Sequence, residues 1–93
     1  MRERRRHIAI RRIDLTHSLV PAHAAAIDAA KTALVAGEPV AAFLLVRGAK
    51  NFLIGGREVY DAAVELAMSH VPARYVRAYP ARPRRRSSAN DFR

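Results

Sequence analysis

The chain lacks cysteine and tryptophan and contains only two lysines. Without cysteine it forms no disulfide and offers no thiolate to zinc. Its four histidines include no i,i+4 pair and no HExxH motif, so we expect neither a metal site nor a cofactor. The absence of cysteine fits a reducing compartment, and we expect a cytoplasmic, intracellular protein.

Long apolar runs are also absent. The longest stretch, Val40 to Val46, is far shorter than the roughly 20 residues that span a bilayer, so no membrane association is expected. The arginine-rich start is not followed by an apolar segment of suitable length, because Arg11, Arg12 and Asp14 interrupt it. We therefore expect no leader peptide.

What the chain has in excess is arginine, and it gathers at the two ends. The 93 residues carry a net charge of +9. Residues 1–12 hold six arginines against one glutamate, residues 73–93 hold seven against one aspartate, and the centre is slightly acidic. Codon bias would explain arginine in place of lysine but not this segregation. Since the arginine fork binds phosphate bidentately, the expected partner is a polyanion.

Residue patterns predict one α+β domain over residues 7–79, between a basic N-terminal arm, 1–6, and a basic Pro/Arg-rich tail, 80–93. The expected elements, in order, are a strand at 7–15, a helix at 19–36, strands at 40–46 and 52–54, a helix at 57–71 and a strand at 74–79. The apolar phase of the first strand switches near Arg11 and Arg12, which predicts a bulge or an end there. Ser18 is the expected N-cap of the first helix, Gly37 follows its end, and Pro72 ends the second helix.

The order β-α-β-β-α-β predicts a ferredoxin-like antiparallel sheet with both helices on one face. The first and last strands would then be neighbours, so the two arginine-rich arms would meet at one end. An acidic outer face is expected on the second helix, from Glu58, Asp61 and Glu65. One feature disagrees, because 40–46 is apolar on both faces although this topology makes it an edge strand. Either a second subunit packs sheet to sheet and covers it, or the topology differs.

The open sheet face would carry alternating tyrosine and arginine, which is typical of a surface that stacks bases and holds phosphates, and equally of a dimer interface. The predicted nucleic-acid-binding residues are Arg4, Arg5, Arg6, Arg11, Arg12, Arg74, Tyr75, Arg77, Tyr79, Arg82, Arg84, Arg85 and Arg86. A second candidate is the turn Gly55-Gly56-Arg57, where free N–H groups at a helix start would bind phosphate. The alternative for this turn is a purely conformational need for glycine.

Acid, base and hydroxyl groups lie close together in Asp14, Thr16, His17 and Ser18. Catalysis requires them to converge on one atom, which adjacency does not provide, so helix capping is the favoured interpretation. We therefore expect a small non-enzymatic protein that binds RNA or single-stranded DNA. The alternative is a phage or mobile-element regulator or inhibitor that grips an acidic protein or occupies a nucleic-acid channel.

Overall fold

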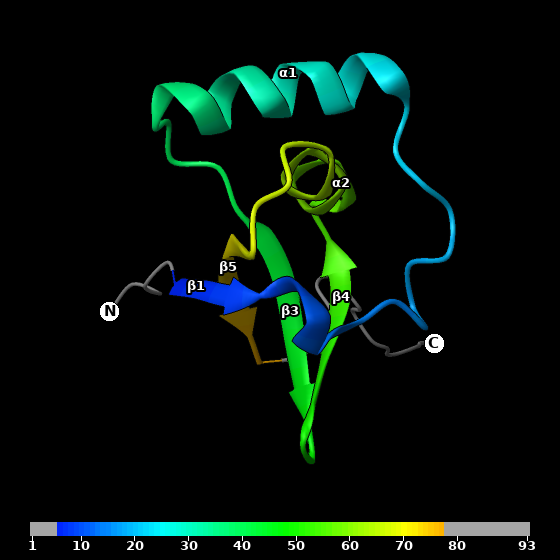
Figure 1. Cartoon of the computed structure of the whole chain (residues 1–93). Coiled ribbons are helices and arrows are strands. Elements are labelled where there is room, and N and C mark those ends of the chain that lie inside the picture. Colours follow the sequence, from blue (N-terminus) through cyan, green and yellow to red (C-terminus); the bar gives the residue numbers. More distant parts are fainter. Residues whose placement is uncertain (1–5, 78–93) are drawn as a thin grey trace, which may run out of the picture.

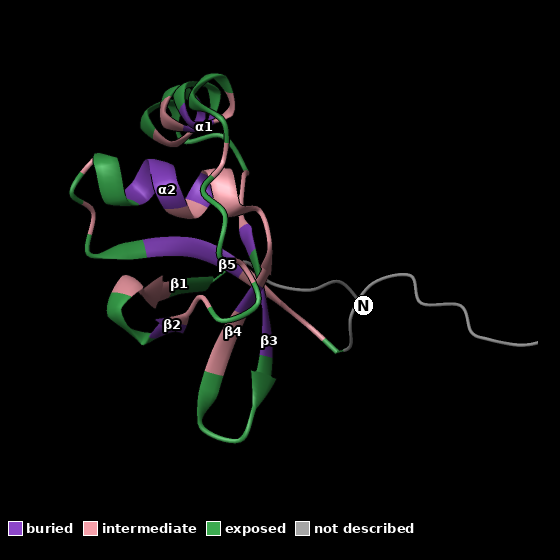
Figure 2. Ribbon diagram, turned by 90° about the vertical axis from the view of Figure 1, so that its right-hand side faces the viewer, coloured by how far each residue is buried: buried purple, intermediate pink, exposed green. Residues whose placement is uncertain are grey.

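The computed structural model describes residues 6–77, in which two helices are stacked on one side of a curled five-stranded sheet (Figures 1 and 2). The elements in chain order are β1 (Arg6–Ala9), the 3-10 turn η1 (Ile10–Arg12), β2 (Ile13–Asp14), α1 (Ala24–Ala36), β3 (Ala42–Arg47), β4 (Lys50–Gly55), α2 (Arg57–Glu65) and β5 (His70–Val76).

The curl of the sheet comes from the segment Arg6–Asp14, which forms β1, η1 and β2. The strand order is β1-β5-β3-β4-β2, so β1 and β2 form opposite edges, yet only the three residues of η1 separate them in sequence. The chain therefore steps from one edge of the sheet to the other, and the sheet closes into a half-barrel. The break falls where the apolar phase switches, so the predicted bulge or strand end near Arg11 and Arg12 is confirmed.

The pairing contradicts the expected ferredoxin-like sheet. β1–β5 and β3–β4 are antiparallel, but β3–β5 and β2–β4 are parallel. The ferredoxin-like prediction is wrong because segment 7–15 supplies two strands on opposite edges instead of one. The fold is α+β with a mixed sheet.

β3 lies at the centre of the sheet and is not an edge strand. It is flanked by β5 on one side and β4 on the other. Leu44 and Leu45 point to opposite faces and are both buried. This position explains the apolar run on both faces through topology, without a second subunit against the sheet.

The helices form two successive layers on the sheet. α2 packs on β3 and β5, and α1 packs on α2 from outside, as Figure 2 shows. The expectation that both helices lie directly on the sheet is therefore corrected. The core joins all three layers and includes Ile27, Ala30, Leu44, Leu53, Val59, Ala63 and Val71.

The start of α1 differs from the prediction. The helix begins at Ala24 with His23 as its N-cap, and no side chain caps it. Ser18 and Pro21 lie in the preceding loop, so Ser18 is not the N-cap. Gly37 follows the helix with φ 75°, which confirms its predicted role at the C-terminal end.

α2 ends six residues before the predicted limit. Ala67 adopts φ 58°, and the N–H groups of Ala67 and Met68 donate to the carbonyls of Val64 (3.0 Å) and Ala63 (2.9 Å). This is a Schellman ending with alanine where glycine is usual. Pro72, the expected helix stop, instead lies inside β5. Pairing between β5 and β3 begins only at Ala73, so the missing N–H of Pro72 removes no hydrogen bond to β3.

The first and last strands are neighbours, as expected, with Arg6 opposite Ala73. The arms at 1–5 and 78–93 lie outside the described residues, so their convergence and the domain limits stay predictions. Across residues 6–77, no helix is long and apolar enough to cross a membrane. The same residues contain no cluster of three or more His, Asp or Glu that would hold a metal ion.

Candidate anion-binding site

A cavity of about 380 Å³ opens between β1, η1, β4 and β5. Its position follows from strand alternation, because residues two apart on a strand point to the same side. Tyr75 follows the buried Ala73 on β5, and Asn51 precedes the buried Leu53 on β4. Both side chains therefore face the interior at the point where the apolar core ends, and η1 crosses in front of them.

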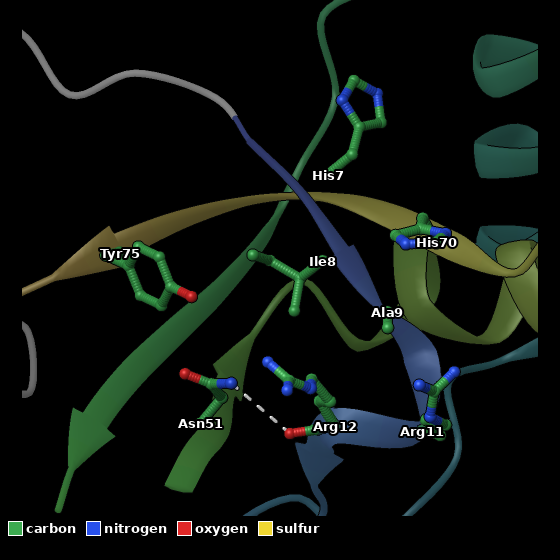
Figure 3. A pocket seen from close by; sticks show the side chains of 8 residues that line it. All are labelled: His7, Ile8, Ala9, Arg11, Arg12, Asn51, His70 and Tyr75. Carbon is green, nitrogen blue, oxygen red and sulfur yellow. Dashed lines mark hydrogen bonds between the residues drawn. The ribbon is translucent and has the colours of Figure 1, made fainter. Parts of the chain in front are cut away.

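Three strands and the 3-10 turn contribute to the lining (Figure 3). The lining residues are His7, Ile8 and Ala9 of β1, Arg11 and Arg12 of η1, Asn51 of β4, and His70 and Tyr75 of β5. In Figure 3 the Arg12 side chain is directed toward Ile8 and Asn51, and Arg11 diverges from it. His7 lies on the other side of the β1 ribbon, as its alternation with Ile8 requires.

Every charged side chain in this lining is a cation. Arg11 and Arg12 are exposed, and within residues 6–77 no aspartate or glutamate lines the cavity. The Asn51 amide and the Tyr75 hydroxyl add neutral donors. A space lined by two guanidinium groups without a carboxylate favours an anion, because the arginines lack an internal counter-charge there.

Two contacts fix the walls of the cavity. Asn51 Nδ2 donates to the carbonyl oxygen of Arg12 at 3.5 Å, a long bond that joins β4 to η1. The guanidinium carbon of Arg6 lies 5.6 Å from the centre of the Tyr75 ring, which adds a third cation beside the mouth.

The structure brings part of the predicted set together. Arg11, Arg12 and Tyr75 line the cavity, and Arg6 stacks on Tyr75. Arg74 points to the other side of β5, by alternation with Tyr75, and Arg77 is exposed beyond the strand. The other predicted positions lie outside the described residues, namely Arg4, Arg5, Tyr79, Arg82, Arg84, Arg85 and Arg86.

Sequence reasoning missed five lining residues, namely His7, Ile8, Ala9, Asn51 and His70. Asn51 was assigned to a turn, although its spacing of two from Leu53 was an available signal that it faces the core side. His70 was placed at a helix end. It opens β5 instead, with its Nδ1 2.8 Å from the Ser69 hydroxyl.

The second candidate, Gly55-Gly56-Arg57, has a clear structural function. Gly56 adopts φ 69°, and a Cβ there would lie 2.7 Å from the Ala41 carbonyl oxygen, so only glycine fits between α2 and β3. Arg57 donates its Nε to Asp61 and another nitrogen to the Ser18 carbonyl. Its guanidinium is therefore already engaged, and phosphate binding at this turn stays a prediction.

Asp61 is buried, which corrects the expected acidic outer face of the second helix. Its Oδ1 lies 2.7 Å from Arg57 Nε, and its Oδ2 accepts the Ala22 N–H at 2.9 Å. The Arg57 guanidinium also lies over the Tyr60 ring, 5.5 Å from its centre. This ion pair holds the loop between β2 and α1 against α2.

Several residues of the β2–α1 junction interact with one another. Asp14 accepts the Thr16 hydroxyl and backbone N–H, the latter at 2.8 Å, and Lys50 Nζ lies 3.8 Å away. The Thr16 hydroxyl, then its N–H, lower the pKa of Asp14 below its ordinary 3.8. His17 packs edge-on to Phe52, with ring centres 4.9 Å apart. Asp14 therefore interacts with Thr16, Lys50 and His17, and the interpretation of these groups as non-catalytic stays a prediction.

The fold resembles that of a known enzyme. The crystal structure of sulfiredoxin from Arabidopsis thaliana matches with a TM-score of 0.69 and 9% sequence identity, over 81% of this chain and 86% of that chain. No protein-family model matches the sequence, and neither does any curated protein. At this identity the likeness establishes the fold alone.

This comparison corrects the functional expectation. A non-enzymatic protein that binds RNA or single-stranded DNA was inferred from the arginine-rich arms and a ferredoxin-like open sheet face, and the alternative regulator from the arms. The chain instead has the fold of sulfiredoxin, an enzyme fold. The expected face is absent because the sheet curls, so that Tyr75 lies in the mouth of a half-barrel. The expectation that the chain is not an enzyme stays a prediction. The expected partners, namely a nucleic acid, an acidic protein or a second copy through the sheet, also stay predictions.

Proposed function

We propose that this chain binds a small anion of the phosphate class in the cavity at the mouth of the half-barrel. The observation that carries the proposal is the lining itself, which contains Arg11, Arg12, the Asn51 amide and the Tyr75 hydroxyl and, among the described residues, no carboxylate. Arginine pairs with phosphate oxygens through two parallel N–H bonds, which gives both affinity and orientation.

The dimensions support a small ligand. A space of about 380 Å³ falls at the lower end of ligand pockets, which hold single molecules of modest size. Ile8 and Ala9 supply an apolar wall next to the cations, so a phosphate ester with a short organic portion fits the mixed lining. The proposed role is binding, and it includes no reaction.

The test is a titration with inorganic phosphate and pyrophosphate, monitored by the amide chemical shifts of the labelled protein at about 50 and 200 mM NaCl. We expect shifts centred on η1, Asn51 and Tyr75, and affinity that weakens with salt because guanidinium groups bind the anion. Arg12→Gln should raise the dissociation constant at least about tenfold, because it removes a charge-assisted pair.

Arg47→Gln is the matched control, since it removes the same charge at an exposed residue that ends β3 and does not line the cavity. It should leave the affinity nearly unchanged. Equal weakening by both substitutions would show that phosphate responds only to the net charge, and the absence of binding at millimolar phosphate would reject the proposal.

A further inference from the structure

His70 is an exposed residue of the cavity lining to which the anion site described so far gives no role. It begins β5 and, in the register between β5 and β1, lies opposite Ala9 (Figure 3). Ala9 is the last residue before η1. The strand pairing therefore sets His70 next to the turn that carries Arg11 and Arg12.

Two hydrogen bonds support this arrangement. The N–H of Ile10, the first residue of η1, donates to the Ser69 carbonyl oxygen at 3.0 Å, which joins the turn to the residue before His70. The Ser69 hydroxyl lies 2.8 Å from His70 Nδ1. Because this hydroxyl engages one ring nitrogen, Nε2 is the nitrogen that can donate to an anion.

The titratable groups that line the cavity with His70 include no carboxylate within residues 6–77. They are Arg11 and Arg12 of η1, His7 of β1 and Tyr75 of β5, with Arg6 of β1 over the Tyr75 ring. In Figure 3, His7 lies on the other side of the β1 ribbon. A positive charge gained by His70 therefore has no acid in the lining to neutralise it, and a bound anion would take that place.

Histidine is the side chain that ordinarily changes its charge between about pH 8 and 5. We propose that the cavity binds a tetrahedral dianion more tightly at acidic pH, because His70 then adds a cation beside Arg11 and Arg12. The inference rests on the proposed anion site and adds pH control to it. In the protonated ring both nitrogens donate, so the Ser69 hydroxyl accepts from Nδ1 and Nε2 donates to the anion. By linkage, anion binding then brings about proton uptake.

The test is the dissociation constant of sulfate at about pH 8 and pH 5.5, measured by calorimetry in two buffers of different ionisation enthalpy. Sulfate stays a dianion over this range, whereas phosphate changes its own charge. We expect binding at least about threefold tighter at the lower pH, because one added charge attracts a dianion through partly screening solvent. Proton uptake should accompany binding at intermediate pH. His70→Gln should remove most of the pH dependence and of the proton uptake.

His23→Gln is the matched control, since His23 is an exposed histidine that precedes α1 and does not line the cavity. It should keep the full pH dependence. Three results would overturn the inference alone: sulfate binding that is equally tight at both pH values, a pH dependence that His70→Gln retains, or an equal reduction by His23→Gln. Absence of sulfate binding at both pH values would reject the anion site itself, and the pH control with it.

Discussion

Ala67 shows at the scale of one residue how local strain is accepted to end a helix. Its φ of 58° lies in the left-handed region, which costs an L-residue roughly 1–2 kcal/mol. Two backbone bonds to α2 fix it there, from Ala67 to Val64 and from Met68 to Ala63. The chain thus turns from α2 into β5 without the glycine that this position usually has.

Replacing Ala67 with glycine should therefore stabilise the fold. We expect Ala67→Gly to raise the free energy of unfolding by about 0.5–1 kcal/mol, because relief of the left-handed strain exceeds the greater chain entropy of glycine. Urea unfolding followed by circular dichroism measures the change. Ala29→Gly, in the middle of α1, should lower it by about 1 kcal/mol. A loss of stability in both variants would refute the strain at Ala67.

At the scale of elements, the Arg57–Asp61 pair joins α2 to the loop that precedes α1. Asp61 is 9% exposed, and it accepts bonds from both Arg57 and the Ala22 N–H. Removing one partner of a buried ion pair leaves the other charge without compensation, which costs roughly 3–5 kcal/mol. The loop depends on this contact because it has no regular secondary structure of its own.

Asp61→Asn should consequently lower the free energy of unfolding by about 3 kcal/mol in urea titrations, and the amides of Ser18 to Ala22 should exchange faster with solvent. Asp28→Asn is the control, since Asp28 is exposed and its 4.0 Å ion pair with Lys31 contributes less than about 1 kcal/mol. Similar losses of stability in the two variants would contradict a stabilising role of the Arg57–Asp61 pair.

The elements also show how far the sequence alone predicts this fold. The phase switch at Arg11 and Arg12 and the glycine after α1 are local signals, and both predictions are confirmed. The end of α2 was missed because alanine occupies the place of glycine, and Pro72 suggested a later stop. The parallel pairings were missed because they follow from how a three-residue turn joins opposite edges, which no local pattern encodes.

The candidate site likewise contains some residues that the sequence predicted and others that it did not. Arg11, Arg12 and Tyr75 were selected from charge and strand alternation, and the structure brings them to one cavity. Asn51 and His70 lie at the starts of β4 and β5, and only the tertiary structure brings them to one cavity. The predicted residue types were therefore informative, while the surface they were assigned to was wrong.

For the whole molecule, the dominant electrostatic feature is an excess of nine positive charges. Such an excess destabilises the compact state by self-repulsion. The exposed ion pairs Lys31–Glu65 and Lys50–Asp14 oppose it, but each contributes at most about 1 kcal/mol. Since salt screens both effects, the larger one decides the sign of the salt dependence.

We expect repulsion to be the larger effect, so NaCl should stabilise the fold. Between about 20 and 200 mM, a gain of about 0.5 kcal/mol would raise the Tm by roughly 2–4 °C for a domain of this size. The measurement is thermal unfolding at a few micromolar protein. The double variant Arg47→Glu with Arg77→Glu lowers the net charge from +9 to +5 at two exposed sites outside the cavity and should show a flatter dependence. A Tm that falls with salt would mean that the ion pairs outweigh the repulsion.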